Sequence, residues 1–577
     1  MAFLSAMNAP SLTKSGVNGS DVYTAVGVGD PRVALYTSLV RDCDVGFIHT
    51  QLKAIREMNA EQADHSAKQV ESLTCQADGS VPIRDAFVMA YQARDVRGGK
   101  GERDAAYKML VELAEGQSAE NVTAMVRLVP EYGSWRDLFA LMEMPSVSGN
   151  FPFTAAVQKV ISEQLVGDEV AMADDKSVSL LAKWMPREGK KDAKHVDFFA
   201  GVLSTDTERT KNWKRMVYRK RVTTLNKYLK TVEIAMCGDH ATKGGRWATI
   251  KPGAVPGRCL KKNRAAFFNE ELIRDKRGKA AKATGLERSE YEDRRACAQH
   301  FKDHIKSGKA VKGATTVFPH EIVKDIRGVS KNQQELLEAQ WEAIRDAAVS
   351  KGGFRRTVPL ADFSASMGGL PMFVSMALGI LVSEVNHEAF RDHVLTFSDT
   401  PSWVFLGGFA DLAEKVRRCQ ESPWGGSTNI EAAFDLILQR MEEHKVPVGE
   451  EPEDLVIFTD MGWDAAFCRG GAAKWQTHID ILQEKFRAAS ERTWGAGQPG
   501  WKMPRIVVWN LRAEFKDYHA TASAHGVIQL SGWSASTLKV LQEGAISTPT
   551  PYQSLRAVLD DPRYDRVRAA FSPASRA

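Results

Sequence analysis

The spacing of apolar residues along the chain divides it into parts of different character. Between about 31 and 235, apolar residues recur every three or four positions, as in residues 84–93 and 105–114, which is the spacing of amphipathic helices. Short breaks with glycine or proline separate these stretches. Many modest helices in series without strands predict an α-solenoid (HEAT-like) or a related helical array, although no repeat of fixed length is visible.

After residue 354 the pattern changes to short apolar runs that alternate with helical stretches. The predicted strands are 357–361, 393–397, 455–459, 505–509 and 527–530, and the predicted helices are 371–384, 429–442, 479–490 and 536–541. Strands that alternate with helices predict a doubly wound, mostly parallel sheet covered on both faces. Ligands of such sheets bind beyond the carboxyl ends of the strands.

These patterns predict four parts of the chain. Residues 1–30 are small and polar and read as a flexible arm, and 31–350 form the helical region, with a basic insertion at about 211–282. Two glycines at 352–353 mark a boundary, so 351–545 is predicted as the α/β domain and 546–577 as a C-terminal tail that docks or frays.

Composition narrows the class of protein. The 577 residues are 43% hydrophobic and 26% charged, as in an ordinary soluble protein of two or more domains. The N-terminus lacks the pattern of a secretory signal, and the longest apolar stretch, 370–382, is too short to cross a bilayer. The seven cysteines form no C-x-x-C pair. We therefore expect a cytoplasmic protein with reduced thiols and no membrane contact.

Oxygen-bearing side chains follow two of the predicted strands. Asp362, Ser364 and Ser366 stand at alternate positions after the first strand, Thr428 precedes a helix, and Asp460 follows the strand 455–459. Alternate residues of an extended loop point the same way, so these oxygens can converge on one Mg²⁺ or another divalent cation. In the alternative, the hydroxyls cap the next helix and the domain binds no metal.

The segment from 211 to 282 is strongly basic, with 20 lysines and arginines against 5 aspartates and glutamates, while the whole chain has a net charge of +5. Aromatic residues such as Trp247, Phe267 and Phe268 stand among the cations, which favours phosphate contacts and base stacking on a nucleic acid. The alternative is a solvated insertion that contacts the protein's own acidic regions. The predicted nucleic-acid-binding residues are Lys211, Lys214, Arg215, Arg219, Lys220, Arg221, Lys261, Lys262 and Arg264.

The Asp-x-Ser-x-Ser loop, the later threonine and the later aspartate resemble the von Willebrand A domain with its metal-ion-dependent adhesion site. The resemblance implies that Asp362, Ser364, Ser366, Thr428 and Asp460 hold the metal and that an acidic group of a partner fills its open position. The chain departs from the family at Ala365, a position that is often glycine.

Further motifs at 94–104, 130–138, 181–187 and 318–322 resemble an uncharacterised family, domain of unknown function 2828, that joins a TROVE-like helical region to a von Willebrand A domain. This family is distantly similar to the Ro ribonucleoprotein, a helical ring that binds single-stranded RNA ends and small structured RNAs. The resemblance implies RNA as a partner, but a fold does not fix a function.

Three functions compete on this evidence. The first is a non-catalytic RNA-binding ribonucleoprotein scaffold, a helical ring closed by the metal-site domain. The second is a metal-dependent adaptor that binds an acidic residue of a protein, for example as partner of an AAA+ ATPase. The third, hydrolysis, has least support, because the sequence offers neither a nucleophile–base pair nor a two-metal carboxylate cluster.

Overall fold

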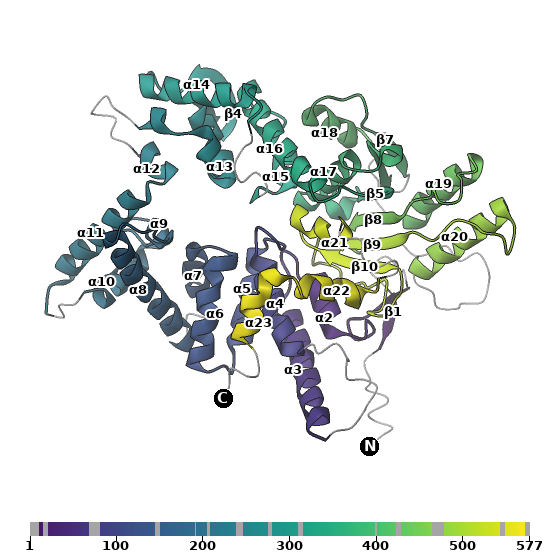
Figure 1. Ribbon diagram of the computed structural model, residues 1–577, viewed down its shortest axis with the longest axis horizontal. Helices are drawn as coiled ribbons and strands as arrows, with labels where there is room; N and C mark the ends of the chain where they lie inside the picture. The colour runs from purple at the N-terminus through teal and green to yellow at the C-terminus, as the bar shows by residue number, and fades with distance from the viewer. Residues whose placement is uncertain are drawn as a thin grey trace. The chain divides into compact units, whose positions relative to one another are not determined.

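The computed structural model shows two compact units (Figure 1). The first contains residues 1–106 and 313–565, and the second contains residues 107–312 and 566–577. The first unit thus extends beyond the predicted domain at 351–545. The residues that the structure describes are 11–15, 21–68, 81–144, 151–190, 192–204, 208–237, 246–274, 280–309, 316–397, 401–422, 429–463, 478–542 and 549–571.

A six-stranded sheet forms the centre of the first unit (Figure 1). Its strands are β5 (Thr357–Asp362), β6 (His393–Phe397), β7 (Ser402–Phe405), β8 (Asp454–Thr459), β9 (Arg505–Asn510) and β10 (Val527–Ser531). Their order is β10-β9-β8-β5-β6-β7, and all neighbours are parallel except β6 and β7. This confirms the predicted mostly parallel α/β sheet. Strand β7 was not predicted.

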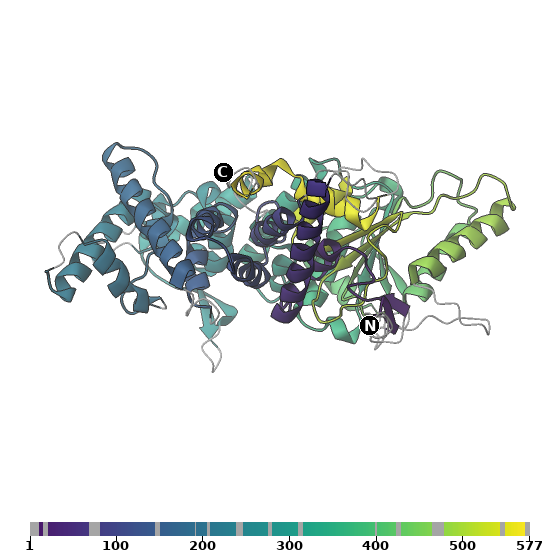
Figure 2. The ribbon, with the colours of Figure 1, turned by 90° about the horizontal axis from the view of Figure 1, so that it is seen from below.

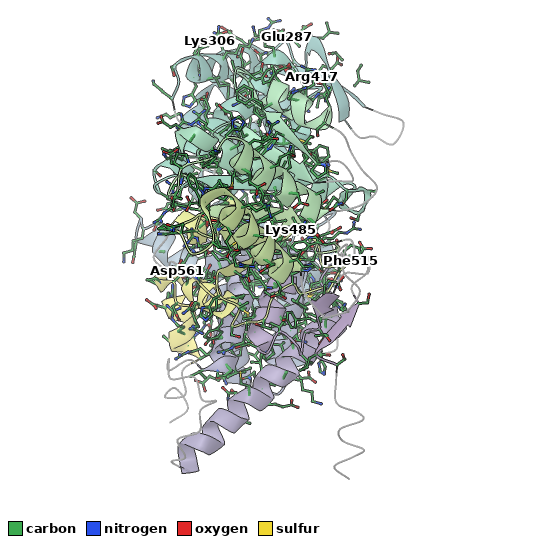
Figure 3. All side chains as sticks on the ribbon, turned by 90° about the vertical axis from the view of Figure 1, so that its right-hand side faces the viewer. Glu287, Lys306, Arg417, Lys485, Phe515 and Asp561 are labelled. Atoms are coloured by element: carbon green, nitrogen blue, oxygen red, sulfur yellow. The ribbon has the colours of Figure 1, made fainter. Side chains whose placement is uncertain are left out.

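Helices cover both faces of this sheet, and the strand residues alternate between the two layers. In β8, Val456 and Phe458 pack in one layer, whereas Leu455 and Ile457 pack in the other. The first layer contains α17 (Leu370–Glu384), α18 (Leu412–Gln420), α15 (Pro319–Asp325), α16 (Lys331–Val349), η8 (Ala535–Leu538) and α21 (Lys539–Gln542). The second contains α19 (Ile430–Glu443) and α20 (His478–Trp494), where Lys485 of α20 pairs with Asp435 of α19 at 2.7 Å (Figure 3).

Both ends of the chain add to the first unit. Where the sequence suggested a loose arm, β1 (Thr13–Ser15) pairs with β2 (Asp21–Tyr23), and the Tyr23 N–H donates to the Tyr518 carbonyl at 2.8 Å. The helices α2 (Pro31–Ser38), α3 (Val45–Lys68) and α4 (Pro82–Arg94) follow, and α5 (Arg103–Ala114) leads into the second unit. The C-terminal elements of this unit are α22 (Pro551–Leu559) and η9 (Pro562–Tyr564), and α23 (Asp565–Ala570) leads into the second unit.

Buried ion pairs fix the C-terminal segment to α4 and to the turn after it. Arg556 pairs with Asp85 at 2.6 Å, and Asp85 also pairs with Arg32 at 2.8 Å. Arg563 pairs with the fully buried Asp95 through two hydrogen bonds. Because each carboxylate loses water on burial, the paired guanidinium is needed to keep it charged. The segment at 549–565 is therefore docked.

Lys100, in the tight glycine turn between α4 and α5, is fully buried. Its ammonium donates to the Tyr36 carbonyl at 2.6 Å, to the Leu39 carbonyl at 3.1 Å and to the Ser531 hydroxyl at 2.6 Å. A cation at the C-terminal end of a helix is stabilised by the helix dipole and by the carbonyls that have no partner in the helix. Lys100 therefore ties the end of α2 to the end of β10.

The second unit is largely helical, as predicted. Its helices are α6 (Ala119–Tyr132), α7 (Trp135–Met142), α8 (Phe151–Ala173), α9 (Leu181–Trp184), α10 (Val196–Val202), α11 (Lys211–Leu229), α12 (Val232–Met236), α13 (Gly257–Phe267) and α14 (Glu292–Lys306). Helices α8 to α11 pack together and are drawn in blue in Figure 2. A HEAT-like repeat among them stays a prediction.

Within the basic insertion the described residues are folded. Strands β3 (Glu270–Arg274) and β4 (Ala280–Glu287) form an antiparallel hairpin between α13 and α14, which the sequence did not predict. Trp247, Phe267 and Phe301 form an aromatic core beside it, with Phe267 stacked on Phe301 at 4.7 Å between ring centroids. None of the helices in the described ranges is long and apolar enough to cross a membrane.

Candidate functional site

The predicted metal ligands Asp362 and Asp460 lie at the carboxyl ends of two adjacent parallel strands, β5 and β8. In chain order the six strands follow the 3-2-1-4-5-6 arrangement, which reverses direction between β5 and β8. In sheets of this order the loops after these two strands leave in opposite directions, and ligands bind at this edge. Both carboxylates are fully buried, so the fold brings two acids together at the point where such sheets bind ligands.

The Asp-x-Ser-x-Ser loop holds Asp362 in a fixed orientation. Its Oδ1 accepts a hydrogen bond from the Ser364 N–H at 2.9 Å, and its Oδ2 accepts one from the Thr459 hydroxyl at 3.0 Å. Ser364 and Ser366 place their hydroxyl oxygens 3.0 Å apart. The loop ends at Gly369, whose φ of +93° favours glycine and turns the chain into α17.

Thr459 and Trp463 support this arrangement, and no sequence pattern pointed to either residue. The Trp463 indole N–H donates to the Thr459 hydroxyl at 3.1 Å, so Trp463, Thr459 and Asp362 form a hydrogen-bonded chain. The Trp463 ring stacks on His519 at 3.7 Å between centroids. The contact between Thr459 and Asp362 joins residues 97 positions apart, which local patterns cannot reveal.

The two carboxylate oxygens of Asp460 differ in their contacts. The Gly462 N–H donates to Oδ1 at 3.0 Å, whereas Oδ2 is buried and has no hydrogen-bond partner among the residues that the structure describes. Burial raises the pKa of Asp460, while the Ser366 hydroxyl, the Gly462 N–H and the Arg512 guanidinium act in the opposite direction. Burial, and after it the charge of Asp460, also raises the pKa of Asp362. Two carboxylates that disfavour each other's charge create a need for a cation between them.

The residues present fit a divalent cation. Mg²⁺ prefers hard oxygen ligands. The site offers Asp460 Oδ2, the Asp362 carboxylate and the two neighbouring hydroxyls of Ser364 and Ser366. Asp362, Ser364, Ser366 and Asp460 would hold the ion, with water in the remaining positions. Thr428, the other predicted ligand, lies outside the residues that the structure describes.

Arg512 and Glu514 form a rim beside these acids, and sequence reasoning missed them. Arg512 donates through Nη1 to the Ser366 carbonyl and pairs through Nη2 with Glu514 at 2.7 Å. Both belong to the loop that follows β9, the strand next to β8. A basic or acidic residue two or four positions after a strand is a signal that could have pointed to them.

The predicted nucleic-acid-binding residues of α11 are divided by their contacts. Lys211 and Arg215 both pair with Asp197, at 2.7 and 2.5 Å, and Arg219 pairs with Glu188 at 3.0 Å. The hydrogen bond from Arg215, followed by that from Lys211, lowers the pKa of Asp197. These three cations thus contact the protein's own acids, as in the alternative interpretation of the basic segment.

Arg221 is the most firmly held of this group. Two hydrogen bonds of 2.6 Å join its guanidinium to the Glu169 carboxylate of α8, and a third of 2.5 Å reaches the Leu203 carbonyl. This bidentate geometry fixes α11 on α8 and leaves Arg221 with a structural role. Among the other predicted residues, Lys220 and Lys262 are exposed, and Lys214, Lys261 and Arg264 are half-buried.

The aromatic residues of the insertion do not offer stacking platforms in this structure. Trp247, Phe267 and Phe268 are 4%, 0% and 3% exposed, and the Arg294 guanidinium covers the Trp247 ring at 3.7 Å. Base stacking requires an accessible ring face. The interpretation of these three rings as base-stacking residues is therefore wrong, because the hairpin and α14 bury them.

Part of the chain, including the site, is similar to known proteins. Residues 356–574 match the family model "Domain of unknown function (DUF7788)". An uncharacterized protein of Acanthamoeba polyphaga mimivirus is 29% identical over 480 residues, which cover 80% of this chain and 77% of that protein. The match to DUF7788 spans the sheet, Asp362, Asp460 and the docked C-terminal segment, whereas the sequence motifs suggested domain of unknown function 2828. Membership of that family and the TROVE and von Willebrand A resemblances stay predictions.

Proposed function

We propose that the first unit is a von Willebrand A-type binding module that holds Mg²⁺ or another divalent cation and binds an acidic group of a partner protein. The observation that carries this proposal is the pair of buried acids at the reversal point of the sheet. There, no described part of the chain gives Asp460 Oδ2 a hydrogen-bond partner. A cation there would satisfy this oxygen and relieve the repulsion between the two carboxylates. With this module the protein would act as an adaptor and would catalyse no reaction.

The doubly wound sheet supports the von Willebrand A-type assignment within this proposal. The exposed rim of the site supports the binding of a group from another molecule. Asp362 and Asp460 are fully buried, while Ser366 is half-buried and Ala365 is exposed. A cation bound by these residues would therefore have protein oxygens on its inner side and solvent on its outer side. Such an ion keeps a position that a partner's carboxylate can fill.

Metal binding is tested with Tb³⁺, whose emission is sensitised by a nearby tryptophan, here Trp463. We expect Tb³⁺ emission that Mg²⁺ suppresses by competition, and its loss in Asp460→Asn and Ser366→Ala. Asp435→Asn is the matched control, because this acid lies on α19 in the same unit and pairs with Lys485. Absence of sensitised emission in the wild-type protein, together with no heat of Mg²⁺ binding by calorimetry, would refute the proposal.

Partner binding is tested by affinity capture with Mg²⁺ or with EDTA. We expect a polypeptide that the wild-type chain retains in Mg²⁺, releases in EDTA and does not bind after Asp362→Ala. Equal recovery of every partner in both buffers would contradict a metal-dependent adaptor. Mass spectrometry of the eluted protein then identifies the partner.

RNA binding by the second unit is a further candidate function, and exposed lysines support it. Lys220, Lys227 and Lys230 are exposed along α11 and at its end, and Lys262 is exposed on α13. Replacing Lys220, Lys227 and Lys262 by glutamate should weaken binding of single-stranded RNA and reduce the slope of log affinity against log salt by about 2. Lys176→Glu, which removes a cation paired with Asp174, is the control. An unchanged slope would reject this surface.

A further inference from the structure

The loop that follows β9 places a cation and an acid directly on the rim of the candidate metal site. The Arg512 N–H donates to Asn510 Oδ1 at 3.0 Å, and Asn510 itself donates to the Thr37 carbonyl at 2.9 Å. Arg512 also donates to the Ser366 carbonyl, within the loop that carries two predicted metal ligands. The Asp-x-Ser-x-Ser loop thus holds one side of the guanidinium in place.

The loop after β9 packs against the loop that carries Asp460. A side chain on Gly462 would lie 2.8 Å from the Phe515 ring and 3.4 Å from Asp460 Oδ1, so Phe515 closes directly over the residue that hydrogen-bonds Asp460 (Figure 3 labels Phe515). Glycine is required at this close approach. Arg512 and Glu514 are therefore carried on a segment that is packed against the loop of Asp460.

Exposure and charge indicate what Arg512 can bind. Its side chain is 37% exposed, and its outward Nη2 pairs with Glu514, which is 50% exposed. An exposed ion pair of this kind contributes little to stability, so a competing anion can replace Glu514 at small cost. The planar fork of a guanidinium matches a carboxylate, and a carboxylate bound to a cation next to it would meet two positive groups at once.

We propose that Arg512 is the second anchor of the acidic ligand at this metal site, and that Glu514 is the resident carboxylate which that ligand displaces. The inference rests on the proposed metal-dependent function. In it, Arg512 helps the site to select a carboxylate, and Glu514 competes with that carboxylate from within the same chain. It predicts that the two residues act in opposite directions: loss of Arg512 weakens the binding of a carboxylate, and loss of the Glu514 charge strengthens it.

The test uses the full chain loaded with Tb³⁺ and sodium acetate as the carboxylate probe, at constant ionic strength. Acetate that binds the ion displaces water and lengthens the Tb³⁺ emission lifetime, which gives a binding curve. We expect Arg512→Ala to weaken acetate binding about tenfold, Arg512→Lys to weaken it less, and Glu514→Gln to strengthen it about threefold. Tb³⁺ binding itself should persist in all three variants.

Lys516→Ala is the matched control, because Lys516 lies in the same loop with the same 37% exposure but pairs with Asp44 at 3.6 Å and faces the Phe47 ring. Its acetate binding should equal that of the wild type. Tb³⁺ binding with equal acetate affinity in Arg512→Ala, Glu514→Gln and wild type would overturn this inference alone. Failure of the wild type to bind Tb³⁺ would overturn the proposed function and this inference with it. Glu514→Gln is a surface change, so its result decides the question even if Arg512→Ala unfolds.

Discussion

Replacing Asp460 by asparagine should stabilise the protein without metal and remove its stabilisation by metal. Asp460 Oδ2 is buried, has no hydrogen-bond partner within the described ranges, and lies at the same edge of the sheet as the buried carboxylate of Asp362. Asparagine has nearly the same shape, carries no charge and keeps an oxygen that can accept from the Gly462 N–H. The substitution therefore removes the cost of the buried charge and keeps the packing.

The magnitude follows from these contacts. A buried polar group without a partner costs about 1–3 kcal/mol when it is neutral and more when it is charged, so we expect Asp460→Asn to exceed the wild type by about 1 kcal/mol in EDTA. For a unit of this size the change corresponds to about 2 °C in the unfolding midpoint per kcal/mol. In Mg²⁺ at a hundred times its dissociation constant, the wild type gains about 2.7 kcal/mol, and the variant gains nothing.

The assay is thermal unfolding followed by tryptophan fluorescence in EDTA and in Mg²⁺, with the wild type, Asp460→Asn and a control on the same strand. Asp454→Asn is that control, because Asp454 is equally buried at the other end of β8 but pairs with Arg505 through two hydrogen bonds. It should lose stability in both buffers, since the buried Arg505 loses its partner. If Asp460→Asn is less stable than the wild type in EDTA, or gains equally from Mg²⁺, our interpretation of the acid pair is wrong.

Three other substitutions test the packing and the electrostatics. Arg563→Ala leaves the buried Asp95 without its guanidinium, so it should lower the free energy of unfolding by about 1–3 kcal/mol. It should also expose the C-terminal segment to limited proteolysis, and unchanged protease resistance would argue against docking. Burial raises the pKa of Glu338 to about 7, so the folded state holds its proton at higher pH than the unfolded chain. Because solvent screens this half-buried carboxyl, we expect only part of the full linkage, a fall in stability of about 1 kcal/mol as the pH rises from about 4.5 to 7. Glu338→Gln should flatten this part of the profile of unfolding midpoint against pH, and an unaltered profile would exclude Glu338 as its cause. Arg221→Ala should lower the unfolding midpoint by several degrees and Lys220→Ala should not, because only Arg221 has a bidentate carboxylate partner; equal midpoints would count against that ion pair.

The secondary structure around the sheet could be predicted from the sequence alone, because each signal for it is local. The apolar runs predicted five of its strands within about one residue, including β5 and β8, and predicted the helices α17, α19 and α20. Strands buried on both faces are continuously apolar, and such runs are visible without any knowledge of their neighbours. The acids Asp362 and Asp460 could be found in the same way, since each stands at the end of such a run.

Which charged and aromatic side chains are available to bind a ligand depends on how distant parts of the chain pack together. Arg221 and Lys220 are adjacent cations in the sequence, but one is paired with Glu169 and the other is exposed, because a helix directs neighbouring residues to different faces. In the sequence, Trp247 looks the same as an exposed stacking residue. The structure shows that Arg294 of α14 covers its ring. Arg512 reaches Ser366 across 146 positions of the chain. Such contacts depend on where distant segments meet, and no local pattern of residues encodes that.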